Sequence, residues 1–82
     1  MPIISRFYGI IIKMFFSEHS LPHIHVVYDE YVGIIDLRTF EMLEGDLPPR
    51  ALSFVQEWGK IHAESLQRMW DAKECYPLPP LV

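Results

Sequence analysis

The sequence of 82 residues contains a single cysteine, Cys75, so the chain cannot form an intramolecular disulfide. It also lacks an excess of basic residues. The 7 lysines and arginines are outnumbered by 11 aspartates and glutamates, which gives a formal net charge of −4. Proteins that bind nucleic acid through phosphate contacts are usually basic. The charge balance therefore disfavours RNA as a partner, although a local basic patch would still permit it.

No apolar run reaches the ~20 residues of a membrane-spanning helix, since Arg6 and Lys13 interrupt the hydrophobic N-terminal segment. That segment also lacks the basic start and the small-residue cleavage site of a secretory signal. We therefore expect a cytoplasmic protein that does not enter a membrane. Half of the residues are apolar and 13% are aromatic, which predicts one folded domain over residues 1–82.

Residues typical of β-strands dominate the first 45 positions, and glycine and proline mark the joints between the segments. The predicted strands cover residues 3–9, 10–16, 23–29, 31–37 and 40–45. Because most of the joints are short, consecutive strands should pair antiparallel. The pattern predicts a meander of four to five strands.

From Pro48 onward the apolar residues recur at intervals of three and four, which indicates one stripe of a long helix over about residues 48–74. Asp46 is its predicted cap, and Gly59 predicts either a kink or a close approach of the helix to the sheet. The proline-rich tail, residues 76–82, cannot continue the helix and should form an extended strap or stay loose. The expected fold class is α+β, with the helix packed on one sheet face and the other face open.

The segment His23-Ile24-His25 places two histidines one residue apart at the start of a predicted strand. Side chains alternate along a strand, and the apolar neighbours Ile24 and Val26 should face the helix. Both histidines should then lie on the open face, beside Lys13, with Cα atoms about 6.6 Å apart. Two imidazoles at this spacing can share one divalent transition metal ion, such as zinc.

A zinc site needs at least three protein ligands, and His19 in the preceding loop is the nearest candidate. The predicted metal set is therefore His19, His23 and His25. Further candidate ligands are Glu18, Asp36 and His62. The alternative interpretation is that the histidines are structural or solvated.

A second chemistry would use the same histidines without metal. In metal-free RNA cleavage, a histidine or tyrosine moves the 2′-hydroxyl proton and cations stabilise the charge that develops on phosphorus. The candidate catalytic residues are His23, His25, Tyr8 and Arg6. The alternative is that they are scattered surface polar groups.

Apolar side chains are also expected on the open face. The predicted patch consists of Ile11, Phe15, Val27 and Tyr31. Exposed apolar patches of this kind often mark a partner site.

Three segments together resemble a known family. They are the start "RFYGI", the middle "HSLPHIH", and "LEGDLPPRAL" where the helix begins. The combination resembles a family of small bacterial proteins called domain of unknown function 4160, over about residues 1–72. The matching positions are Arg6, Phe7, Tyr8, Gly9, His19, Pro22, His23, His25, Asp36, Pro48, Arg50, Ala51, Leu52, Trp58 and Trp70.

The resemblance implies no catalytic residues, because the family has no established set. Its members are commonly encoded beside a second small protein, in the manner of a toxin–antitoxin pair in which this family is the toxin-like member. Three hypotheses follow. In the first, the protein is the toxin-like member of such a two-gene module and acts through its open face, either as a small ribonuclease or by binding a small protein partner. In the second, it is a His-x-His metal-binding protein, structural or a metal-dependent hydrolase. In the third, it is a non-enzymatic interaction module, for example a homodimer.

Overall fold

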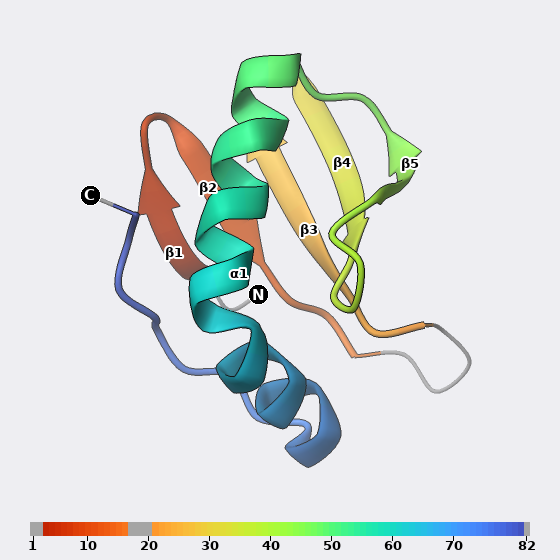
Figure 1. The fold of residues 1–82 in the computed structure, drawn as a ribbon, viewed down its shortest axis with the longest axis vertical. Coiled ribbons are helices and arrows are strands. Elements are labelled where there is room, and N and C mark those ends of the chain that lie inside the picture. The colour runs from red at the N-terminus through yellow and green to blue at the C-terminus, as the bar shows by residue number, and fades with distance from the viewer. Residues whose placement is uncertain (1–2, 17–20, 82) are drawn as a thin grey trace.

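The computed structural model describes residues 3–16 and 21–81 and contains five strands followed by one helix. The elements are β1 (Ile3–Phe7), β2 (Ile10–Lys13), β3 (His23–Tyr28), β4 (Tyr31–Asp36), β5 (Met42–Gly45) and α1 (Pro49–Ala72). The strands form one sheet in chain order, with every neighbouring pair antiparallel, and α1 lies across one face (Figure 1). The predicted α+β arrangement is confirmed.

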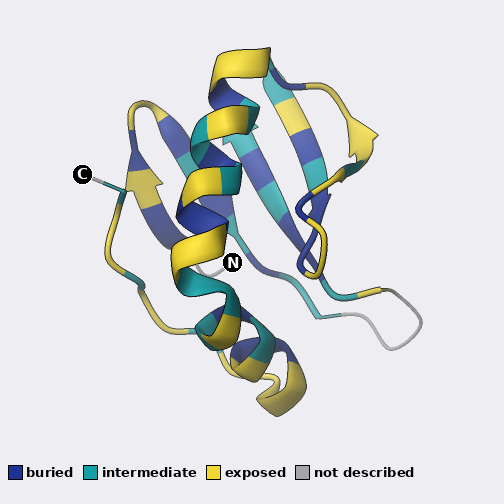
Figure 2. Cartoon of the chain, viewed as in Figure 1, coloured by how far each residue is buried: buried dark blue, intermediate teal, exposed yellow. Residues whose placement is uncertain are grey.

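The register of the sheet assigns each strand residue to one of two faces, because directly opposed residues project to the same side. Ile12 opposes Val26, and Ile24 opposes Ile35. All four are fully buried beneath α1, and buried residues alternate with more exposed ones along the central strands (Figure 2). This face, with the inner side of α1, forms the core.

Gly59 marks a close approach of the helix rather than its kink. The ring of Phe40 packs against the backbone of Gly59, in the space that a β-carbon would occupy. The non-helical residue lies three positions later, at His62, with φ −109° and ψ 16°. The predicted kink at Gly59 is therefore wrong, and the alternative prediction of a close approach is correct.

The predicted cap at Asp46 is wrong. The helix has Pro48 at its N-cap position and makes no side-chain capping hydrogen bond. Asp46 is instead tied to the sheet, because its backbone N–H donates to the carbonyl of Val32 at 3.1 Å. A residue fixed in this way two positions before the N-cap does not cap the helix.

The proline-rich tail forms an extended strap, residues 76–81, that runs back along β1 (Figure 1). The N–H of Leu78 donates to the carbonyl of Ile4 at 2.9 Å, and the indole Nε1 of Trp58 donates to the carbonyl of Pro79 at 2.9 Å. The strap therefore joins the first strand to the middle of the helix. No helix in the described ranges is long and apolar enough to cross a membrane.

Candidate functional site

The sheet face opposite α1, here called the open face, carries two rows of side chains defined by the strand register. The first row runs from β1 to β4 through Arg6, Ile11, Val27 and Val32. The second row runs from β2 to β5 through Lys13, His25, Ile34 and Glu44. Among residues 3–16 and 21–81 there is no second helix to cover this face.

The centre of the open face is apolar. Ile11, Val27 and Ile34 are half-buried, and Val32 is 51% exposed. A sheet normally buries its apolar side chains against a second layer. Four such residues side by side on an uncovered face form a surface suited to contact with another protein.

The edges of the open face carry opposite charges. Exposed Arg6 and half-buried Lys13 lie on β1 and β2, whereas exposed Glu44 lies on β5. Neither Arg6 nor Glu44 forms an ion pair within the part of the chain that the structure describes. The face is therefore basic at one edge, apolar in the middle and acidic at the other edge.

One member of the predicted patch lies elsewhere. Tyr31 opposes Tyr28, on the same side as the buried residues Phe7 and Ile10, so it faces the helix side of the sheet. Val32 and Ile34, rather than Tyr31, are the β4 residues of the apolar patch on the open face. Shifting the assumed alternation of side chains by one residue in the segment 31–37 would have placed Val32 and Ile34 on the open face.

His23 and His25 project from the same side of β3, with ring centroids 5.2 Å apart. The Nδ1 atom of His23 lies 2.7 Å from the carbonyl oxygen of Leu21. Because a carbonyl can only accept a hydrogen bond, Nδ1 carries the proton and Nε2 of the neutral ring keeps its lone pair. An imidazole held in this tautomer is prepared to accept a proton or to bind a metal through Nε2.

The surroundings of His25 favour its neutral form. Its ring packs nearly perpendicular to that of Phe15, with centroids 4.4 Å apart, and Lys13 opposes it on β2. Burial lowers the pKa of His25 below its ordinary value, and the charges of His23 and Lys13 lower it further. The uncharged form of His25 therefore persists to lower pH than that of an ordinary histidine.

The helix covers His23, contrary to the prediction that both histidines lie clear of it. His23 is only 9% exposed, and Trp70 lies over it with ring centroids 5.2 Å apart. α1 is kinked at His62, where the backbone is not helical, and its last turns lie beyond the ends of the strands (Figure 1). Trp70, in these last turns, reaches the imidazole of His23.

The structure does not bring together a complete metal site from the residues it describes. His19 and Glu18 lie outside the described residues, so the set His19, His23 and His25 stays a prediction. Within residues 3–16 and 21–81, no three His, Cys, Asp or Glu side chains gather to hold a metal ion. His62 packs against Trp58 in α1, with ring centroids 5.1 Å apart.

Asp36 opposes His23 in the register, but its carboxylate is already engaged. It accepts hydrogen bonds from the backbone N–H of Arg38 at 2.7 Å and from the guanidinium at 3.2 and 3.3 Å. The hydrogen bond from the Arg38 side chain lowers the pKa of Asp36 below its ordinary value. Asp36 thus stabilises the β4–β5 turn, and its carboxylate is not free to act as a metal ligand.

The four candidate catalytic residues do not form one cluster. Tyr8 lies in the β1–β2 turn, at the opposite end of the sheet from the start of β3, and its ring stacks on Phe54 of α1 at 4.7 Å. Arg6 shares the open face with His25 but lies two strands away from it. The histidine pair is therefore separated from Tyr8, one of the four residues that the RNA-cleavage hypothesis names.

Comparison with protein families identifies the chain. The family model described as Domain of unknown function (DUF4160) matches residues 9–71. The chain belongs to this family. The DUF4160 match contains the histidine pair and every residue named in the two open-face rows except Arg6, and it ends before the strap. Comparisons with curated proteins and with solved structures return no match.

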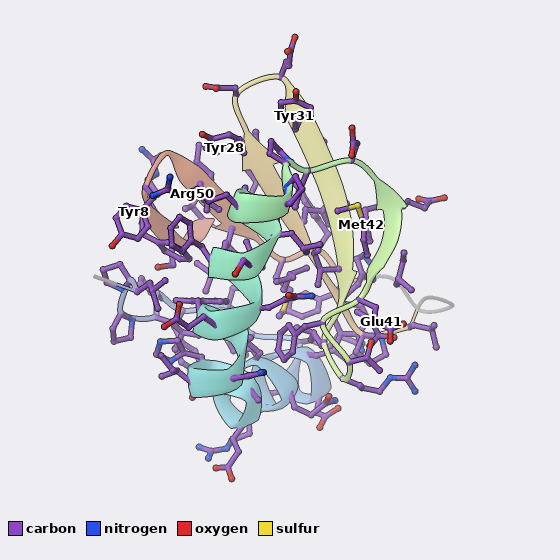
Figure 3. The ribbon with its side chains drawn as sticks, turned by 45° about the horizontal axis from the view of Figure 1, so that its top comes forward. Tyr8, Tyr28, Tyr31, Glu41, Met42 and Arg50 are labelled. Atoms are coloured by element: carbon purple, nitrogen blue, oxygen red, sulfur yellow. The ribbon has the colours of Figure 1, made fainter. Side chains whose placement is uncertain are left out.

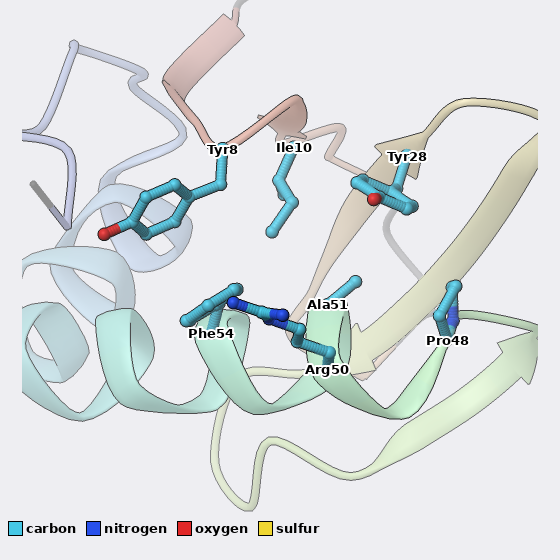
Figure 4. Close-up of a pocket in the computed structure, with 7 residues that line it drawn as sticks. All are labelled: Tyr8, Ile10, Tyr28, Pro48, Arg50, Ala51 and Phe54. Carbon is cyan, nitrogen blue, oxygen red and sulfur yellow. The ribbon is translucent and has the colours of Figure 1, made fainter.

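Tyr8 lines a cavity of about 370 Å³ in this DUF4160 protein. It lies between the β1–β2 turn, the end of β3 and the first turns of α1, with Tyr8 and Arg50 at the same end of the molecule (Figure 3). Tyr8 and Tyr28 line one side, and Arg50 and Phe54 line the other (Figure 4). The guanidinium carbon of Arg50 lies 5.6 Å from the centroid of Phe54, a cation–π contact.

Tyr8 has a positive φ of 52°, which glycine or asparagine would adopt at lower cost. The following Gly9 has φ 78°, so the pair forms the two central residues of a tight turn with the handedness that hairpins favour. The turn places the Tyr8 ring over α1. Tyr8 therefore belongs to the packing between turn and helix rather than to the histidine pair.

Proposed function

We propose that this protein works by binding another protein through the open face of its sheet, as the toxin-like member of a bacterial two-gene module. The observation that carries the proposal is the group of four apolar side chains at the centre of the open face, of which Val32 is 51% exposed. Removing such side chains from water contributes about 25 cal/mol per Å² to association. The two-gene context is the part of the proposal that the family resemblance implies.

Protein binding agrees with the other properties of the chain better than RNA cleavage does. A net charge of −4 weakens attraction to a phosphate backbone, but it does not hinder contact with a protein of complementary pattern. The separation of Tyr8 from the histidines also leaves RNA cleavage without one of its proposed groups. Both points favour a binding role for the open face.

The test uses the product of the neighbouring gene as the ligand. We expect expression of this protein alone to arrest growth, co-expression of the neighbour to restore it, and the purified pair to bind in calorimetry. Val32→Asp should weaken binding at least about tenfold, because it buries a charge in the interface. Ile61→Asp is the matched control, since Ile61 is 65% exposed on α1 and lies away from the sheet. Normal growth together with no binding would contradict the proposal.

A second function, metal binding, is supported by the tautomer of His23. Nδ1 of His23 donates to the carbonyl of Leu21, so Nε2 stays available. The ring centroids of His23 and His25 are 5.2 Å apart. We expect zinc or nickel to bind with sub-micromolar affinity at neutral pH and to dissociate below about pH 5.5, where imidazoles are protonated. His25→Gln should abolish binding and His62→Gln should not. Affinity no tighter than millimolar would exclude this function.

A further inference from the structure

We propose that a second copy of this chain covers the open face, and that the two copies are related by a two-fold axis parallel to β3. The inference rests on the proposed function, because it takes the open face to be a protein-binding surface and names one occupant for it. The partner from the two-gene module would then compete with the second copy for the same residues.

The charge pattern selects the axis. Two identical sheets can stack face to face about a two-fold axis that runs along the strands or across them. An axis across the strands places β1 of one copy over β1 of the other, so that each Arg6 faces another basic edge. An axis along the strands places β1 over β5 and brings Arg6 to the acidic edge of the second copy, one row away from Glu44. Only the second arrangement joins opposite charges at both edges.

The same axis also matches the apolar residues. It stacks β3 on β3, so the central Val27 and the neighbouring Ile34 of each copy lie in the middle of the contact. Sheets packed in this way lie about 10 Å apart with their strands nearly aligned. The arrangement buries the exposed Val32 and gives the domain the second layer that its fold lacks on this side.

The experiment measures the association state of the purified full chain by sedimentation velocity at low salt, at concentrations up to about 100 µM, a range that detects weak interfaces. We expect a dimer that dissociates as salt screens the edge charges. Arg6→Glu and Glu44→Arg should each raise the dissociation constant about tenfold or more, because each places like charges together at both edges. The two changes combined in one chain should restore the dimer.

The combined variant decides the geometry. With the axis across the strands, R6E/E44R would still oppose like charges and would not recover. Arg68→Glu is the control, because Arg68 is exposed on α1 outside the sheet, and circular dichroism checks that each variant is folded. A wild-type chain that stays monomeric at about 100 µM, or a combined variant that fails to recover, would overturn the inference.

The outcome separates this inference from the proposed function. A dimer with the predicted charge-swap behaviour that ignores the neighbouring gene product supports the inference and contradicts the proposed function. A monomer that binds that product through Val32 overturns the inference and supports the proposed function. A dimer that the product dissociates supports both.

Discussion

The two faces of the sheet are built from the same strands but have different surroundings. On the covered face, Ile12, Ile24 and Val26 are fully buried beneath α1. On the open face, Val27 is half-buried and Val32 is half-exposed, although both are as apolar as the residues of the core. The strands therefore carry more apolar surface than one helix can cover, and the excess on the open face is what a binding partner would use.

The largest loss of stability is expected on the covered face, at Trp58. Its side chain is fully buried, and its indole N–H donates to Pro79 in the strap. Trp58→Ala should lower the free energy of unfolding by about 3–5 kcal/mol, measured by urea denaturation. Trp58→Phe keeps most of the packing and loses the hydrogen bond, so it should cost about 1 kcal/mol. Equal losses in the two variants would show that the hydrogen bond, not the packing, dominates.

The next effect concerns the contact between α1 and the β4–β5 turn. Gly59→Ala should destabilise the protein by about 1–3 kcal/mol, because the new methyl group enters the space of the Phe40 ring. Helix propensity alone predicts the opposite, a gain of about 1 kcal/mol. Ser53→Ala, at an exposed site in the same helix, is the control, and thermal melting compares the two. A stabilised Gly59→Ala variant would mean that the helix does not approach Phe40 so closely.

A matched pair of valines compares the two faces directly. Val26→Thr buries a hydroxyl in an apolar core and should cost about 1–3 kcal/mol. Val32→Thr places the same hydroxyl on the open face, where it meets water, so the change should stay within about 0.5 kcal/mol. Both are measured on dilute, monomeric protein by denaturant titration. Similar costs at the two positions would show that the open face is covered within one chain.

The smallest expected effect is the pH dependence from His25. Because its folded pKa lies below the unfolded value of 6.5, the unfolded chain takes up a proton first as the pH falls. The contribution of His25 to stability is therefore complete above about pH 6.5 and is lost as the pH falls below 6.5 and through the folded pKa. Thermal melts between pH 7.5 and pH 5 should show a decline that His25→Gln reduces. A wild-type melting temperature that rises over this interval would contradict the assignment.

Most of the fold could be predicted from the sequence, because it depends on local signals. Alternation and turn residues located the strands, and the change of period at Pro48 located the helix within two residues of its observed ends. The errors concern contacts between distant parts of the chain. Asp46 resembles a helix cap in sequence, but a hydrogen bond to Val32 on β4 holds it in the sheet.

The candidate site was harder to predict, for the same reason. Alternation placed His25 correctly with Lys13, but no local rule indicates that the end of α1 reaches back to cover His23 with Trp70. Tyr8 is close to Arg6 in sequence and far from the histidines in space, because the turn directs it toward α1. A one-residue step along a strand reverses the face, which is why Tyr31 was assigned to the wrong side and Val32 was missed.

The strap along β1 also affects how the sheet can grow. An outer strand with free backbone groups invites another chain to extend the sheet, and a fibre needs two such strands on every molecule. The hydrogen bond from Leu78 to Ile4 occupies the β1 edge, and β5 is the outer strand that the strap does not line. Edge-to-edge addition through β5 alone ends after two molecules. A strap along β1 therefore leaves β5 as the outer strand through which the sheet can be extended, while face-to-face contact through the open face stays available.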